Sequence, residues 1–356
     1  MDLARRSLVL ALLAVVTGLP ASVAKDLPLA GIVAASVGEQ VVLADVGSEW
    51  QAGFSTGPVG WLYPAPGGVL FAPDLVNGAT TVFDLRRRMP VERLVGVSTP
   101  VFGPSDDRYL VLAGNVLLVS YPERARLVEI EAELVAPWQA VVTPEETSLL
   151  VLERSPTGEG PSLMSAVDLV NRRQVYRQEL EGDVLRMALA PALGLLALAD
   201  AEGQCIRLVQ PSTLATVLTV PLTGRPRDVA FVGLPEMMIA AVASAEGRGE
   251  LVLWRLTAKQ GTLKLKRPRS LPLATPPLVL AAAPTQSHVA VALESGAVEL
   301  VELKRWLVVR TLQLPGAPRH VVWCDPLRRG PLLPEWSDQK RPELPFSSSW
   351  GESDRR

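Results

Sequence analysis

Short apolar runs, separated by turns of Gly, Pro or polar residues, follow one another along most of the chain. Some runs are continuous, such as Leu195 to Ala199 and Val289 to Leu293, and others alternate apolar with polar residues, such as Glu299 to Leu303. A continuous run predicts a strand covered on both faces, and an alternating run predicts a strand with one face toward water. Helical spacing is nearly absent, so the pattern predicts an all-β fold.

These runs recur in groups of four with a period of about 40 to 50 residues, which is the length of one β-propeller blade. In each group an inner strand is followed by a continuous apolar strand, an alternating strand and an outer strand. The inner strands are expected to begin at Pro58, Pro100, Pro137, Val184, Pro226, Pro277 and Pro318. Six complete four-stranded blades are therefore predicted between Pro58 and Ala317.

The two ends of the repeat region supply a seventh blade. Ile32 to Ser36, Val41 to Val46 and Trp50 to Ser55 read as three strands with no inner strand before them. His320 to Cys324 reads as an inner strand with nothing after it. We expect the N- and C-terminal strands to pair in one blade, because this closure removes the open sheet edges of the ring.

The phrases "VTPEETSLLVLER", "SAVDLVNRRQVYRQELEG" and "GRPRDVAFVG" run from an apolar strand through a turn to a Val-x-Asp-Leu strand and a Gly-x-Pro junction. In this respect Leu29 to Asp325 resembles the YVTN-type repeat family of bacterial extracytoplasmic propellers. "TVFDLRRR" and "LVLWRL" are similar to the third strand of WD repeats, although the Gly-His dipeptide and the regular Trp-Asp of that family are missing. The resemblance implies a propeller that works outside the cytoplasm.

The first 24 residues are typical of an export signal. Arg5 and Arg6 form its charged region, Leu8 to Val16 its apolar core, and Ser22 to Ala24 a small-residue cleavage site. The mature protein, predicted to be periplasmic or extracellular, then comprises a propeller at 25–325 and a disordered Pro/Ser-rich tail at 326–356. The sequence leaves open whether export uses the general or the twin-arginine route, and whether tail aromatics such as Trp336 bind a partner.

Composition narrows the function classes. Hydrophobic residues make up 48% of the chain and charged residues 20%, which favours a folded domain over disorder. The net charge is −2 and no basic stripe is present, so nucleic acid is an unexpected partner. No later apolar run is long enough to span a membrane. Cys205 and Cys324 lie in blades apart from one another and are expected to be buried free thiols.

Any binding site of a propeller is expected where the inner strands begin, because these junctions meet at the mouth of the central channel. Arg225, Arg227 and Arg319 occupy matching junctions in "TGRPRD" and "GAPRH". They form either a cationic ring for a carboxylate, sulfate or phosphate, or a set of salt bridges between blades. Further ligand-binding candidates at these junctions are Arg186, Trp138 and His320.

Catalytic and metal sites lack their usual sequence signals. The chain has two histidines, His288 and His320, and neither Cys-x-x-Cys, Cys-x-x-Cys-His nor Gly-x-Ser-x-Gly. We therefore expect no metal, no cofactor and no catalytic residue. Asp84 and Asp168 recur at one blade position and are interpreted as turn residues, while Trp61, Trp254 and Trp323 are interpreted as packing between blades.

Two function classes remain, with a structural surface protein as a third possibility. The first is a non-enzymatic binding scaffold that holds a protein partner or a small anionic ligand at the channel face. The second is an enzyme or cofactor carrier resembling propeller lactonases or haem-d1-binding propellers, with His320 as its central imidazole. The step from fold to either function is analogy.

Overall fold

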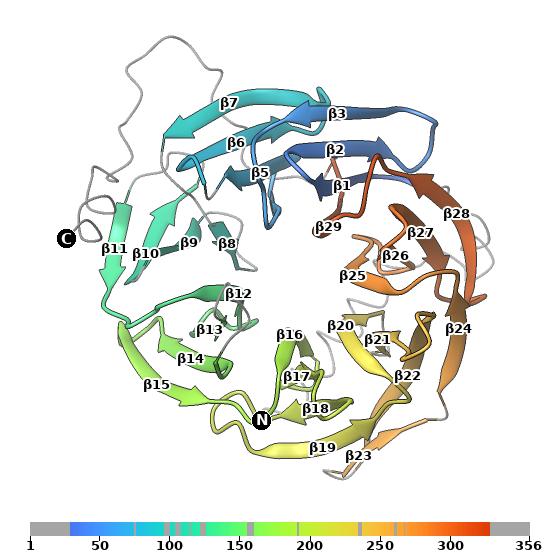
Figure 1. The fold of residues 1–356 in the computed structure, drawn as a ribbon. Coiled ribbons are helices and arrows are strands. Elements are labelled where there is room, and N and C mark those ends of the chain that lie inside the picture. Colours follow the sequence, from blue (N-terminus) through green and yellow to red (C-terminus); the bar gives the residue numbers. More distant parts are fainter. Residues whose placement is uncertain are drawn as a thin grey trace, which may run out of the picture.

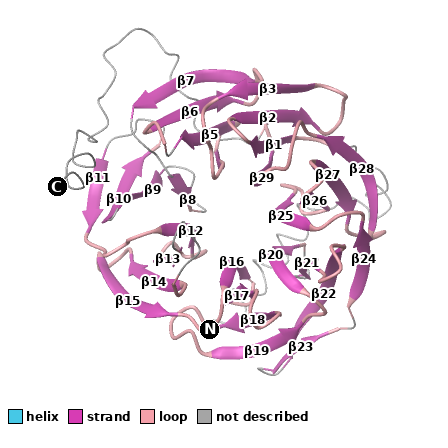
Figure 2. Cartoon of the chain, in the orientation of Figure 1, coloured by secondary structure: helices cyan, strands magenta, loops and turns pink. Residues whose placement is uncertain are grey.

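The computed structural model describes residues 29–327, except 75, 96–99, 104–107, 114, 122–125, 155–159, 191, 234–236, 260–261 and 267. Every regular element in this part of the chain is a strand, and the strands form seven antiparallel sheets arranged around a common axis (Figures 1 and 2). This is the seven-bladed propeller that the repeat predicts. The predicted export signal at 1–24 lies outside the described residues, as does the tail from 328 onward.

The closing blade joins both ends of the chain, as predicted. Its strands, in order from the axis, are β29 (His320–Cys324), β1 (Ile32–Val37), β2 (Gln40–Asp45) and β3 (Gln51–Ser55). Val33 pairs with Trp323 and Ala35 with Val321 in antiparallel register. The last strand of the chain thus completes the sheet that the first strands begin.

The next three blades follow one another along the chain. The second blade consists of β4 (Tyr63–Ala65), β5 (Val69–Asp74), β6 (Ala79–Asp84) and β7 (Met89–Val95). The third consists of β8 (Pro100–Phe102), β9 (Arg108–Ala113), β10 (Asn115–Ser120) and β11 (Arg126–Ile130). The fourth consists of β12 (Pro137–Val142), β13 (Ser148–Glu153), β14 (Leu163–Asp168) and β15 (Arg173–Glu179).

Three further blades complete the ring. The fifth consists of β16 (Val184–Ala190), β17 (Leu195–Asp200), β18 (Cys205–Val209) and β19 (Thr216–Pro221). The sixth consists of β20 (Arg225–Val232), β21 (Met237–Ala243), β22 (Gly249–Lys259), β23 (Thr262–Leu265) and β24 (Arg269–Leu273). The seventh consists of β25 (Pro277–Ala282), β26 (His288–Leu293), β27 (Ala297–Glu302) and β28 (Leu307–Gln313).

The sixth blade departs from the four-stranded plan. Strand β22 is long enough to pair with two partners: Gly249 to Leu253 pair with β24, and Leu256 to Lys259 pair with β23. The additional hairpin accounts for the longest spacing in the repeat, between Pro226 and Pro277. Its strand β23 places Leu263 and Leu265 against the apolar cluster shared by the fifth and sixth blades.

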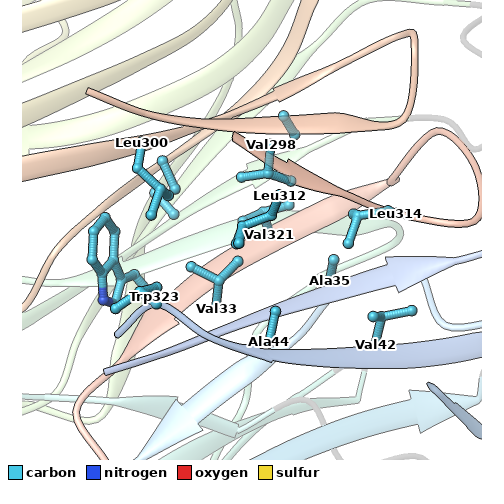
Figure 3. Close-up of a cluster of buried hydrophobic side chains, with 14 of the residues drawn as sticks. Val33, Ala35, Val42, Ala44, Val298, Leu300, Leu312, Leu314, Val321 and Trp323 are labelled. Atoms are coloured by element: carbon cyan, nitrogen blue, oxygen red, sulfur yellow. The ribbon is translucent and has the colours of Figure 1, made fainter. Parts of the chain in front are cut away.

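Apolar side chains fill the space between neighbouring blades, because a blade in the ring is covered on both faces. At the closure, Val33 and Ala44 from the closing blade pack against Leu300 and Leu312 from the seventh blade, with Trp323 at one end of the cluster (Figure 3). Burial of side chains of this size stabilises the fold by about 1.5–3 kcal/mol each. The ring is therefore closed by hydrophobic packing as well as by the β29–β1 hydrogen bonds.

Both cysteines are buried free thiols, as predicted. Burial raises the pKa of Cys324 to about 12, with a smaller contribution from Asp325. Asp168 accepts hydrogen bonds from the backbone N–H groups of Val170 and Asn171. Asp84 accepts equivalent hydrogen bonds from the N–H groups of Arg86 and Arg87. These are Asx turns, which confirms their interpretation as structural residues.

Candidate functional site

A β-bulge recurs at the start of four consecutive inner strands. The register shifts by one residue between Pro137 and Gln139, and equivalently in β16, β20 and β25. The unpaired residues are Trp138, Leu185, Arg227 and Leu278. Because a bulge redirects the side chains around it, it decides which residue at each junction faces the channel.

The first paired residue after each bulge is here called the clasp position. It is occupied by Gln139, Arg186, Asp228 and Val279, and the first paired residue of β29 is His320. Gln139 Oε1 accepts a hydrogen bond from the N–H of Met187 at 2.8 Å, in the next blade. Asp228 Oδ2 accepts one from Leu280 at 2.8 Å, again in the next blade.

His320 fastens the closing blade to the second blade in the same way. Its Nδ1 accepts a hydrogen bond from the N–H of Leu62 at 3.1 Å. Met187, Leu280 and Leu62 each follow directly after Arg186, Val279 and Trp61. At three interfaces, the N–H of the residue that follows the clasp position is therefore bound by a side chain of the preceding blade. In the second blade, Trp61 occupies the clasp position.

Arg186 and Val279 do not follow this pattern, because neither a guanidinium nor an aliphatic side chain has an acceptor atom. At the next blade the corresponding N–H belongs to Val229, and it is bound by Oδ1 of Asp228 itself at 2.8 Å. Asp228 thus satisfies two backbone donors, one in its own strand and one in β25. Arg186 makes no contribution of this kind to ring closure.

The guanidinium of Arg186 instead contacts two indole rings. Its central carbon is 4.5 Å from the ring centroid of Trp61 and 5.2 Å from that of Trp138. Such cation–π contacts leave N–H donors of the guanidinium available for hydrogen bonds. One of them, Nη1, is 3.4 Å from the carbonyl oxygen of Leu185, and no described carboxylate lies within ion-pair distance.

The two indoles and an imidazole form one aromatic cluster at this end of the channel. Trp61 meets Trp138 edge to face at 5.4 Å and lies 4.4 Å from the ring of His320. Trp138 is held by a 3.1 Å hydrogen bond from Nε1 to the carbonyl of Leu185, which is the bulged residue of the next blade. Trp61, Trp138, Arg186 and His320 thus meet from four different blades.

Burial controls the charge state of this cluster. Burial lowers the pKa of Arg186, and the charge of nearby Asp228 opposes this shift. Burial raises the pKa of Asp228, and the charge of Arg186 opposes that shift. Burial, with a further contribution from the charge of Arg186, lowers the pKa of His320 to about 3. His320 is therefore neutral at pH 7, with its proton on Nε2 because Nδ1 accepts the bond from Leu62.

A cavity of about 450 Å³ occupies the channel beside the cluster. Trp61, Arg186, Asp228 and His320 lie at its polar part, and side chains of the inner strands β8, β12, β16 and β20 line the remainder. Its volume lies within the range of about 300–1,000 Å³ that is usual for small-molecule sites.

The arginines of the repeated Gly-x-Pro-Arg motif have a different environment. Arg225 donates to Asp183 at 3.1 Å, and Asp183 also accepts a 2.7 Å hydrogen bond from Arg154. Arg227 lies 3.6 Å from Glu294 of the seventh blade. The expected cationic ring requires at least two unpaired arginines, but only Arg319, which is exposed, has no ion pair within the described chain. Arg225 and Arg227 form the salt-bridge alternative.

A turn glycine sets the position of this rim network. Gly182 has φ of +73°, and a Cβ atom there would lie 2.5 Å from both carboxylate oxygens of Asp200. A larger residue is therefore excluded at the turn that leads into β16. The turn places Asp183 at the rim, where it binds two arginines, and starts the strand that carries Arg186 into the channel.

Of the six candidates predicted from sequence, the structure brings together Trp138, Arg186 and His320 and leaves the other three at the rim. It adds Trp61, which had been interpreted as packing between blades, and Asp228. Trp254 and Trp323 are buried in clusters between blades, in agreement with their interpretation. Among the described residues, no three His, Cys, Asp or Glu side chains gather as metal ligands, and no helix is suited to crossing a membrane.

The fold and channel define a seven-bladed β-propeller. No protein-family model matches the chain, and no curated protein matches it. Solved structures are similar in fold at low identity. A putative 6-phosphogluconolactonase from Bacteroides fragilis has 10% identity and a TM-score of 0.60, over 83% of this chain and 98% of that one.

Two further solved structures are similar to a comparable extent. A chain of the mitotic checkpoint complex has 12% identity and a TM-score of 0.60, with 78% of this chain and 85% of that chain covered. The β-propeller domain of Cps50 from Myceliophteria thermophila has 12% identity and a TM-score of 0.56, with 74% and 89% covered. At these identities the similarity shows the fold alone.

Proposed function

We propose that this chain is an exported, non-enzymatic binding propeller that holds a small anionic ligand at the mouth of its central channel. Arg186 carries the proposal. It occupies a clasp position without acting as a clasp, and its charge contacts Trp61 and Trp138 with no carboxylate within ion-pair distance, although the charge of Asp228 acts on it from farther away. A buried charge without a partner is costly, and an anionic ligand would offset that cost.

The geometry of the cluster suits an anion with a planar, two-oxygen acceptor. The in-plane donors of Arg186 form the fork that binds a carboxylate through two parallel hydrogen bonds. His320, which also contacts Trp61, adds an Nε2–H donor that is fixed in this tautomer by its bond to Leu62. Fixed donors of this kind bind without a large loss of side-chain entropy.

Binding is favoured over catalysis by the state of His320. A general acid or base works best with a pKa near the operating pH, and burial lowers the pKa of His320 to about 3. Its Nδ1 is also engaged in closing the ring. His320 therefore serves as a positioned neutral donor in this proposal, which also includes membership in the YVTN-type repeat family and export by the N-terminal signal.

Thermal unfolding in sodium acetate, compared with sodium chloride at the same ionic strength, tests the proposal. Acetate is expected to raise Tm, because a ligand at ten times its Kd stabilises the folded state by about 1.4 kcal/mol. Arg186→Gln should abolish the difference between the two salts. Arg225→Gln, which removes a paired rim arginine, should keep it. An acetate effect that survives Arg186→Gln, or no effect in the unmodified protein, would refute the proposal.

A further inference from the structure

The lining of the channel cavity combines polar and apolar side chains. Gln139, Arg186, Asp228 and His320 are charged or polar. The four inner strands β8, β12, β16 and β20 also supply apolar side chains, here called the apolar wall: Val101, Phe102, Val142, Leu189, Ala230 and Phe231. A ligand that fills the cavity therefore meets both kinds of side chain.

The charges limit the ligand to one negative charge. Arg186 is the one channel cation among the described lining residues, and it already interacts electrostatically with Asp228. A dianion such as phosphate would bring a second negative charge toward Asp228 with no second guanidinium to balance it, and like charges repel strongly where water is scarce. A single carboxylate balances Arg186 with one charge and two oxygens.

The apolar wall defines the rest of the ligand. An apolar group that covers these side chains in place of water gains affinity. Trp61, Trp138 and His320 cluster beside Arg186, where the carboxylate would bind. Inside the cavity the carboxylate and the apolar body are then held at fixed, separate places.

We propose, on the basis of the anion site above, that the ligand is an amphiphilic monocarboxylate: its carboxylate binds Arg186 and Nε2–H of His320, and its apolar body extends along the channel toward Val142 and Phe231. Deeper burial of the body should increase affinity by about fourfold for each methylene, which corresponds to about 0.8 kcal/mol at 25 °C. The gain should end when the cavity is full.

Isothermal titration calorimetry with acetate, butyrate, hexanoate and octanoate tests this directly, with 1-octanol and inorganic phosphate as comparison probes. We expect Kd to fall with chain length, and octanol and phosphate to bind at least tenfold more weakly than octanoate. Arg186→Gln should remove the preference for octanoate over octanol. Ala230→Leu narrows the cavity, so Kd should stop falling at a shorter chain length than in the unmodified protein. Ala188→Leu is the second variant if Ala230→Leu unfolds.

The outcomes separate this inference from the anion site on which it rests. If all four carboxylates bind with equal Kd and require Arg186, the anion site is supported, and the proposed contact between the cavity and an apolar chain of the ligand is wrong. If phosphate binds as tightly as octanoate, the monocarboxylate is wrong. If octanol matches octanoate, the carboxylate contact is wrong. If none of the anions binds, the proposed function fails as well.

Discussion

Arg225 and Arg186 stand near the starts of neighbouring inner strands and have opposite surroundings. Arg225 is 53% exposed and shares Asp183 with Arg154, so three blades meet in a salt-bridge network at the rim. Arg186 lies beside two indoles in the channel, with one long hydrogen bond to a carbonyl. The rim arginine is ion-paired in the protein, whereas the channel arginine has no ion pair and interacts with Asp228 only at longer range.

The difference distinguishes residues that have the same structural role in several blades from a residue that is exceptional at its position. Arg227 and Arg319 recur at the last position of Gly-x-Pro-Arg, and of these two only Arg227 is ion-paired among the described residues. At the clasp position the common property is an acceptor for the next blade's N–H, which Gln139, Asp228 and His320 supply. Arg186 and Val279 lack that property, and of these two only Arg186 brings a charge into the channel, so the exception at Arg186 points to function.

Removing the carboxylate that closes the ring beside Arg186 should have the largest effect. Asp228→Leu leaves the N–H groups of Val229 and Leu280 without an acceptor, and each buried donor left unsatisfied costs about 1–3 kcal/mol. We expect a loss of about 3 kcal/mol or more in the free energy of unfolding, measured in urea. Asp183→Asn at the rim is the control, with an expected loss of less than about 1 kcal/mol. Equal losses would show that the clasp has no special role.

Acid should destabilise the protein through His320. Its pKa is about 3 when folded and 6.5 in a model peptide, so the unfolded state binds more protons between these values. Stability contributed by the neutral imidazole is then full above pH 6.5 and decreases, by up to about 1.4 kcal/mol per pH unit, as the pH falls toward 3. His320→Gln, which keeps an acceptor for Leu62, should flatten this part of the stability profile.

The other histidine provides the control for this pH dependence. Burial also lowers the pKa of His288, but by less, and His288 binds no backbone group of another blade. His288→Gln should therefore change the slope of stability against pH less than His320→Gln does. The same slope in the protein with and without His320 would contradict the assignment of a buried neutral imidazole.

The rim arginines should have the smallest effect. Arg225→Gln and Arg227→Gln each remove one partly exposed ion pair, and such pairs contribute about 0.2–1 kcal/mol. Urea unfolding should show losses in that range, and smaller losses at high salt because the charges are screened. A loss above about 2 kcal/mol in the free energy of unfolding for either variant would contradict this expectation and show that the rim ion pairs contribute strongly to stability.

The ring itself could be predicted because its signals are local. Pro100, Pro137, Val184 and Pro277 are the first residues of their inner strands, and the structure begins β20 one residue before the expected Pro226. Continuous apolar runs and Gly or Pro turns have the same meaning in every blade, so each repeat strengthens the interpretation of the others.

The site could be predicted only in part because its geometry is set by bulges and by contacts between distant segments. A bulge shifts the alternation of side chains by one residue, and nothing in the junctions "APWQ" and "DVLR" marks it, so the direction of Arg186 does not follow from the sequence. Asp183, the partner of Arg225, lies 42 residues earlier in the chain. Aligning the blades on the N–H that follows each clasp position would have separated Arg186 from Gln139 and Asp228.

The location of a bound anion tests the central claim most directly. Crystals soaked with 4-bromobenzoate, an unreactive monocarboxylate, would reveal its bromine by anomalous scattering. We expect a bromine peak inside the channel, with the carboxylate on Arg186, and no such peak in crystals of Arg186→Gln. A peak only at the rim beside Arg225 or Arg319, or the same channel peak without Arg186, would contradict it.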